Sequence, residues 1–156
     1  MPRSAATSIL CCLLLTTLAC SPPPEEVYTP GLGEIMSLNQ MRHTKLWFAG
    51  QAHNWPLAAY ELDELREGFA DAARFHPTYR DAQLPLSQLI PKMTDQPLAQ
   101  LDAAVASQDE ARFGEAFAAL TAACNDCHEA TNFGFNVVVI PRFNPYTNQE
   151  FAPPAR

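Results

Sequence analysis

The chain has 156 residues, enough for one compact domain and too few for two. Apolar residues make up 47% of it and charged residues 17%, with 14 prolines and only 6 glycines, which argues against a disordered polyelectrolyte. The 17 acidic side chains outnumber the 10 basic ones, and this net charge of -7 argues against nucleic-acid binding. The five cysteines are an odd number, so their positions carry the most information.

The first nineteen residues have the pattern of an export signal. Arg3 precedes an apolar run over residues 9–15 that is too short to span a bilayer. The end of the signal, Leu18-Ala19-Cys20, resembles a bacterial lipoprotein box, which implies cleavage before Cys20, lipid on that thiol, and anchorage to a membrane in the periplasm. By the same resemblance, Ser21 implies the outer membrane. The alternative is a plain secretory signal with Cys20 as a spare thiol.

The mature chain is expected to begin with a tether. Removal of residues 1–19 leaves 137 residues with a net charge of -8, because Arg3 is lost. Residues 20–28 contain Pro22-Pro23-Pro24, which favours a stiff, extended segment. The helical domain is predicted to occupy residues 29–129.

Helical patterns follow in chain order. Thr29-Pro30 predicts the start of a first helix that reaches Gln51. Asn54 predicts the N-cap of a second helix, which has Pro56 in its first turn and ends before Pro77. Apolar residues of this second helix recur at spacings of four and three, which indicates one buried stripe: Ala58, Leu62, Leu65, Phe69 and Ala72.

Proline content predicts a long connection over residues 78–93. A short third helix is expected to be capped by Thr94 or Asp95, and a capping box from Ser107 to Glu110 predicts the start of the fourth. The apolar stripe of the fourth helix comprises Phe113, Phe117, Leu120, Cys124 and Cys127. Two tight joints and one crossover predict an all-α, four-helix up-down bundle.

The composition changes over residues 130–156. Phe133 to Pro141 is β-branched and aromatic, and the residues from Asn144 onward are typical of turns and coil. Because an isolated strand has no partner in this chain, we expect an extended C-terminal tail that packs on the bundle, and no sheet.

The fourth predicted helix ends in C-x-x-C-H, at Cys124-Asn125-Asp126-Cys127-His128, which is the attachment signature of c-type haem. The spacing suits the chemistry, because two thiols add to the two vinyl groups on one edge of the porphyrin and the next residue is held beneath the iron. Cys124 and Cys127 are therefore predicted to attach one haem c covalently, with His128 as the proximal iron ligand.

Three alternatives fit this motif less well. A thioredoxin-like redox pair stands at the start of a helix, and a tetrahedral zinc site needs a second close pair of ligands. A disulfide between Cys124 and Cys127 would close a small, strained loop. Haem attachment also accounts for every thiol, since Cys11 and Cys12 leave with the signal and Cys20 takes lipid.

A haem motif on the last of four helices, close to the C-terminus, is similar to class II c-type cytochromes, the cytochrome c′ type. The resemblance covers residues 29–129 and implies a haem held inside an exported four-helix bundle. The tail departs from this pattern, which ends soon after the motif. Residues 42–50 and 144–149 also resemble a group of small exported bacterial haem proteins of uncharacterised role.

The start of the first helix should face the end of the fourth, because the two run antiparallel in such a bundle. Met36 has the better position for the distal side of the iron, since His43 lies about 10 Å further along the helix. The imidazole of His43 is the stronger ligand, so His43 is the predicted distal ligand and Met36 the alternative. Both side chains also suit ordinary core roles. Basic side chains are expected near the haem propionates, and the candidates are Arg42, Lys45, Arg112 and Arg142.

These features predict an electron carrier that is not catalytic on its own. One covalent haem, tethered by lipid in the periplasm, would pass single electrons between periplasmic redox partner proteins. The resemblance to cytochrome c′ implies an alternative, a five-coordinate haem that binds nitric oxide or carbon monoxide for sensing or detoxification. A third possibility is a haem subunit of a larger periplasmic oxidoreductase. No nucleic-acid partner is expected, and the lipid is the predicted contact with the membrane.

Overall fold

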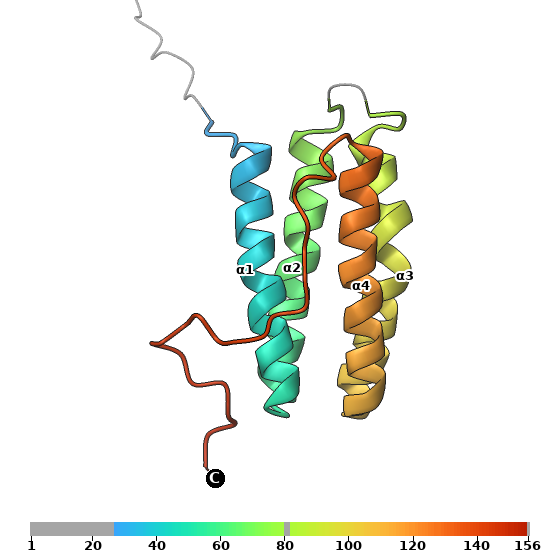
Figure 1. Ribbon diagram of the computed structural model, residues 1–156. Helices are drawn as coiled ribbons and strands as arrows, with labels where there is room; N and C mark the ends of the chain where they lie inside the picture. Colours follow the sequence, from blue (N-terminus) through green and yellow to red (C-terminus); the bar gives the residue numbers. More distant parts are fainter. Residues whose placement is uncertain (1–26, 80–81, 156) are drawn as a thin grey trace, which may run out of the picture.

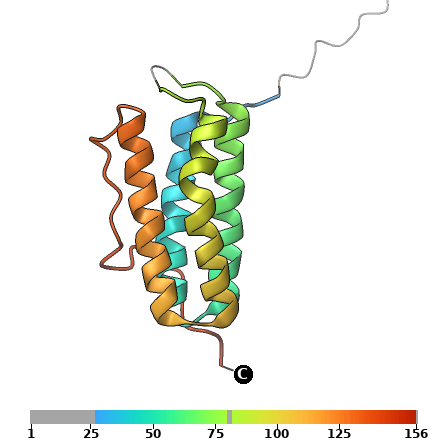
Figure 2. The same ribbon diagram turned by 90° about the vertical axis from the view of Figure 1, so that its right-hand side faces the viewer.

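The computed structural model describes residues 27–79 and 82–155, and its helices form a four-helix bundle (Figure 1). The helices are α1 (Leu32–Gln51), α2 (Trp55–Phe75), α3 (Leu86–Ser107) and α4 (Glu110–Ala130). Helices that follow one another in the chain run in opposite directions, and two views at right angles show them side by side (Figures 1 and 2). No strand occurs in the part of the chain that is described. The predicted all-α, up-down bundle is therefore confirmed.

Local sequence signals predict several helix ends correctly, whereas the N-caps of α1 and α4 lie two residues later than predicted. The Asn54 side chain caps α2 as predicted, because its Oδ1 accepts a hydrogen bond from the Leu57 backbone N–H at 3.4 Å. The prediction that α1 starts at Thr29-Pro30 is wrong, since the N-cap is Gly31.

The capping box predicted for the fourth helix is also wrong in its position. Asp109 is the N-cap of α4, and its carboxylate accepts a hydrogen bond from the Arg112 backbone N–H at 3.0 Å. Ser107 instead ends α3, where its hydroxyl donates back to the Ala103 carbonyl at 2.8 Å. A carboxylate at the N-cap suits the positive end of the helix dipole, which favours the later start.

The third helix is much longer than its prolines predict. It begins at Leu86, not at Thr94, and it contains both Pro91 and Pro97. A proline inside a helix removes one backbone hydrogen bond, so the local signal disfavours this conformation. Burial outweighs that cost here, because Leu86, Leu89 and Ile90 are each only 3% exposed and belong to one apolar cluster.

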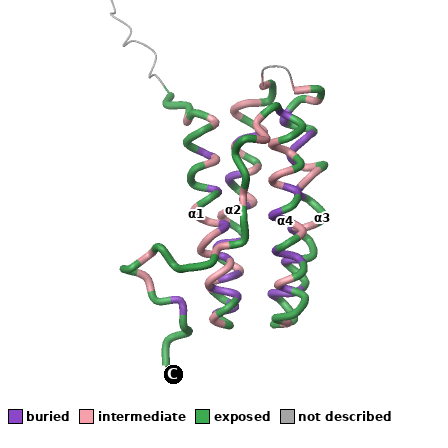
Figure 3. Tube along the Cα trace, in the orientation of Figure 1, coloured by how far each residue is buried: buried purple, intermediate pink, exposed green. Residues whose placement is uncertain are grey.

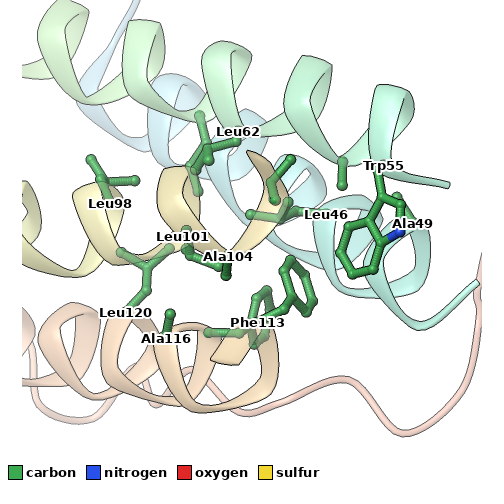
Figure 4. Close-up of a cluster of buried hydrophobic side chains, with 14 of the residues drawn as sticks. Leu46, Ala49, Trp55, Leu62, Leu98, Leu101, Ala104, Phe113, Ala116 and Leu120 are labelled. Atoms are coloured by element: carbon green, nitrogen blue, oxygen red, sulfur yellow. The ribbon is translucent and has the colours of Figure 1, made fainter. Parts of the chain in front are cut away.

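Most of the core lies in one half of the bundle, where α1 ends and α4 begins (Figure 4). Phe113 and Phe117 of α4 are fully buried, and the ring of Trp47 from α1 lies 4.8 Å from that of Phe117. Buried residues recur along the helices (Figure 3), and those of the stripe predicted for the second helix are Ala58, Leu62, Leu65 and Ala72. The fully buried aliphatic side chains of this half are Leu46, Leu62, Leu65, Leu101 and Leu120.

The opposite half, where α1 begins and α4 ends, has a smaller apolar cluster. Its buried members include Ile35 and Ala72, and Met36 and Cys127 pack against it while partly buried. Dense packing at one end of the bundle and looser packing at the other leave room for a cavity beside the C-x-x-C-H motif.

Residues 131–155 leave the end of α4 and run back along the bundle without forming a helix or a strand (Figures 1 and 2). Most of this tail is exposed (Figure 3). Phe151 near its end is buried and packs against Phe48, and the Phe151 carbonyl accepts a hydrogen bond from Asn54 Nδ2 at 3.1 Å. In the described part of the chain, no helix is both long and apolar enough to cross a membrane.

Candidate haem site

A cavity of about 570 Å³ lies between the first half of α1 and the last half of α4. Cys124, Cys127 and His128 line it from α4, and Met36 and His43 line it from α1. Leu65, Phe69, Leu86 and Ile90 form its inner wall, and Phe133, Asn136 and Val138 of the tail complete the lining. Its volume lies in the range of small-molecule and cofactor sites, roughly 300–1,000 Å³. The structure therefore brings together the predicted attachment cysteines, the predicted proximal ligand and both candidates for the distal ligand.

The two motif cysteines are free thiols on one face of α4, separated by one helical turn. Burial raises the pKa of the Cys124 thiol to about 12, and burial also raises the pKa of Cys127. Both side chains are therefore neutral thiols at pH 7, and neither forms a disulfide in the structure.

The His128 imidazole is oriented by a backbone carbonyl of the tail. Its Nδ1 lies 2.5 Å from the carbonyl oxygen of Asn136. A carbonyl can only accept, so Nδ1 carries a proton, and in the neutral imidazole the lone pair is therefore on Nε2. This is the arrangement that fixes the tautomer of a metal-binding histidine and makes the imidazole a stronger donor.

Asn125, a variable position of the motif, holds the tail in place. Its Nδ2 donates to the Val138 carbonyl at 2.9 Å, and its Oδ1 accepts from the Val138 backbone N–H at 2.8 Å. The Phe133 backbone N–H donates to the His128 carbonyl at 2.7 Å. These contacts place Asn136 opposite the His128 ring. We call residues 133–138 the proximal strap.

The proximal strap is a part of the candidate site that the sequence did not predict. The predicted extended tail contained it, but nothing in the sequence paired Asn125 with Val138. An asparagine inside a haem motif, followed by a β-branched segment after a short turn, is the only signal that could have suggested it.

His43 on α1 is buried, with 4% of its surface exposed, and burial lowers its pKa to about 4. Its Nε2 lies 3.0 Å from the hydroxyl of Thr121, and that hydroxyl donates its own proton to the Phe117 carbonyl at 2.9 Å. The hydroxyl must therefore accept from His43, which places the imidazole proton on Nε2. In this arrangement Nε2 has no lone pair for a metal.

The contact between His43 and Thr121 also sets the register of the two helices. Met36 precedes His43 by seven residues, and His128 follows Thr121 by seven. Because α1 and α4 run antiparallel at 1.5 Å per residue, each step covers about 10 Å in the same direction. Met36 is therefore level with His128, across the cavity.

None of the four basic side chains proposed for the propionates lines the cavity. Three of them form ion pairs elsewhere: Arg42 with Glu64 at 3.0 Å, Lys45 with Glu61 at 3.7 Å, and Arg112 with Asp109 at 3.4 Å. Arg142 is exposed on the tail. The lipidation candidate Cys20, the export signal and most of the predicted tether lie outside the described residues.

Comparison with known proteins finds no relative: no protein-family model matches the chain, and neither a curated protein nor a solved structure matches it. The resemblance to class II cytochromes thus depends on the haem motif and its place on the fourth helix.

Proposed function

We propose that this protein is a monohaem c-type cytochrome that transfers single electrons. The observation that carries the proposal is the shared cavity, which Cys124, Cys127 and His128 all line. Haem c would be joined to the two cysteines by thioether bonds and would supply the one-electron chemistry of an iron that cycles between its ferrous and ferric forms.

The residues that line the cavity suit a covalently attached haem c. The two thiols are neutral and one turn apart, and the His128 Nε2 lone pair is available to iron. Among the described residues there is no group of three or more His, Cys, Asp or Glu side chains that could hold a bare metal ion. A haem needs no such group, because the porphyrin provides four nitrogen ligands itself.

The chain's own residues would set the properties of the site. Leu65 and Ile90 are buried in the inner wall and exclude water from that side. Asn136 accepts the Nδ1 proton of His128, which increases electron donation by the imidazole. An apolar wall would favour ferrous haem, the form of lower charge, and would raise the redox potential. A stronger imidazole donor would favour ferric haem and would lower the potential.

Chemistry alone favours His43 as the distal ligand, because imidazole binds iron more strongly. The geometry of the cavity supports Met36 better. Met36 is level with His128, whereas the Nε2 proton of His43 is already donated to Thr121. Binding of iron by His43 through Nε2 would need the other tautomer and loss of that hydrogen bond, because in the present tautomer Nδ1 is the ring nitrogen with a lone pair.

The proposal extends to where the protein acts. Residues 1–20 have the lipoprotein pattern, and c-type haem is attached outside the cytoplasmic membrane, so we place the protein in the periplasm with a lipid on Cys20. Its acidic net charge would guide it to basic patches on periplasmic redox partners.

The function is tested by a redox titration of the purified holoprotein, combined with electron paramagnetic resonance. We expect a reversible one-electron transition and a low-spin ferric signal that becomes high-spin in Met36→Ala. His43→Ala, the matched change on the same helix face, should stay low-spin. High-spin iron in the wild-type protein would contradict the six-coordinate carrier and favour the five-coordinate, gas-binding alternative.

A further inference from the structure

One buried polar group of the cavity has no partner in the protein. Asn39 lies on α1 between Met36 and His43, is 5% exposed, and lines the cavity. Its Nδ2 is the one buried side-chain nitrogen or oxygen without a hydrogen-bond partner in the described part of the chain. Buried donors are nearly always satisfied, so this amide points to an acceptor that belongs to a bound molecule.

The orientation of the amide follows from its neighbours. Asn39 Oδ1 accepts a hydrogen bond from Arg42 Nη1 at 3.3 Å, and Arg42 Nη2 donates to Glu64 at 3.0 Å. A flipped amide would turn its NH₂ group toward the guanidinium, which has donors only, so the flip is disfavoured. The NH₂ group of Asn39 is thus the part of the amide that can still donate a hydrogen bond to a bound molecule.

Gly68 of α2 makes room for this arrangement. A Cβ atom at position 68 would overlap the Asn39 amide oxygen, and it would also approach the Arg42 guanidinium. The absence of a side chain at that point lets α1 and α2 hold the amide against the cavity wall.

The amide lies on the distal side of the proposed haem. Asn39 follows Met36 by three residues, so it is about 4.5 Å further along the same face of α1. Met36 is level with His128 across the cavity, which places Asn39 on the side of the haem that is opposite to the proximal histidine.

We infer that Asn39 Nδ2 forms a binding site for a small exogenous ligand of the iron that carries a hydrogen-bond acceptor, of the chemical class of azide. The inference rests on the proposed function, because it needs the haem. The amide donates to the ligand atom that points away from the iron, and the site thereby favours acceptor-bearing ligands over carbon monoxide, whose oxygen accepts weakly.

A haem propionate is a less suitable partner. Among the residues that the structure describes, no Lys or Arg lines the cavity, and both Nη atoms of the nearby Arg42 are already engaged. A propionate buried there would keep an uncompensated charge, which is costly. The charge of azide is compensated by ferric iron.

The test is a titration of the ferric holoprotein with azide, followed by its absorption spectrum. Asn39→Leu removes the donor, and Asn39→Asp keeps the acceptor for Arg42 while removing the donor. We expect the Kd for azide to rise about tenfold in Asn39→Leu, the effect of one hydrogen bond, and by more in Asn39→Asp, whose carboxylate also repels the anion. Carbon monoxide affinity of the ferrous form should change less than twofold.

Two further variants make the test specific. Thr94→Val is the matched control, because the Thr94 hydroxyl lines the same cavity but already donates to the Ile90 carbonyl at 2.9 Å. It should leave the azide Kd unchanged. Gly68→Ala displaces the amide without removing it and should weaken azide binding. Because Met36 is the proposed distal ligand, azide must displace it, and the same comparison is therefore repeated in a Met36→Ala background, where the iron has no such competitor.

An azide Kd in Asn39→Leu within twofold of the parent protein, in both backgrounds, would overturn the inference. The same result accompanied by a shifted redox potential would assign the amide to a propionate. These failures differ from failure of the proposed function, in which the purified chain carries no covalent haem at all.

Discussion

Replacing Asn125 by alanine should release the proximal strap from α4. The substitution removes both hydrogen bonds that join the Asn125 amide to the Val138 backbone, at 2.9 and 2.8 Å. At about 1 kcal/mol for each bond, opening of the strap becomes easier by about 2 kcal/mol. The Val138 amide hydrogen should therefore exchange with solvent about thirtyfold faster.

Release of the strap should also change the iron. Without a fixed Asn136 carbonyl, the Nδ1 proton of His128 loses its acceptor, and the imidazole becomes a weaker donor. A weaker donor stabilises ferric iron less, so the redox potential of the holoprotein should rise.

The assay combines hydrogen exchange, read by mass spectrometry, with a potentiometric titration. Asn144→Ala is the matched control, because the exposed Asn144 side chain accepts a hydrogen bond within the tail, from the Tyr146 backbone N–H at 2.8 Å. That variant should leave the potential and the exchange of Val138 unchanged. Unaltered exchange in Asn125→Ala, or a potential that falls, would refute the role of the strap.

Three further predictions concern titration, thiol reactivity and packing. Burial lowers the pKa of His43 from 6.5 to about 4, so as the pH falls the imidazole is protonated in the unfolded state before it is protonated in the folded state. The free energy of unfolding should therefore fall by about 3 kcal/mol between pH 6.5 and pH 4. Urea unfolding should show that loss in the parent protein and not in His43→Gln. Iodoacetamide should modify Cys127 faster than Cys124 in haem-free protein at pH 8, because the pKa of Cys124 is raised to about 12 and Cys127 is less buried; equal rates would contradict this. Gly50→Ala should destabilise the bundle by roughly 1–3 kcal/mol, because its Cβ would overlap a fully buried phenylalanine ring of α4, whereas Gly114→Ala, which meets no neighbouring atom, should not.

Features that depend on neighbours in the sequence were predictable. Asn54 caps its helix through a backbone N–H three residues on, and the stripe that includes Leu62 and Leu65 repeats with the helical period. The C-x-x-C-H motif is likewise local, and the antiparallel order of the helices was enough to bring Met36 and His43 to the same cavity as His128.

Features that depend on tertiary contacts could not be predicted. The start of α3 at Leu86 contradicts its prolines, because burial of that segment outweighs the lost backbone bond. The hydrogen bond between His43 Nε2 and Thr121 joins residues 78 apart in the chain, so the sequence alone did not indicate it. Asn39 also looks unremarkable in sequence, since its importance depends on the position of Arg42 and on Gly68 of another helix.

Measurement of the intact mass of the purified protein shows whether Cys124 and Cys127 bind one haem covalently. The chain, expressed in a bacterium that matures c-type cytochromes, should gain the mass of one haem and keep its colour after extraction with acidified acetone. Cys124→Ser combined with Cys127→Ser should lose both. A wild-type chain without the added mass, or a double variant that retains haem through the extraction, would contradict the account.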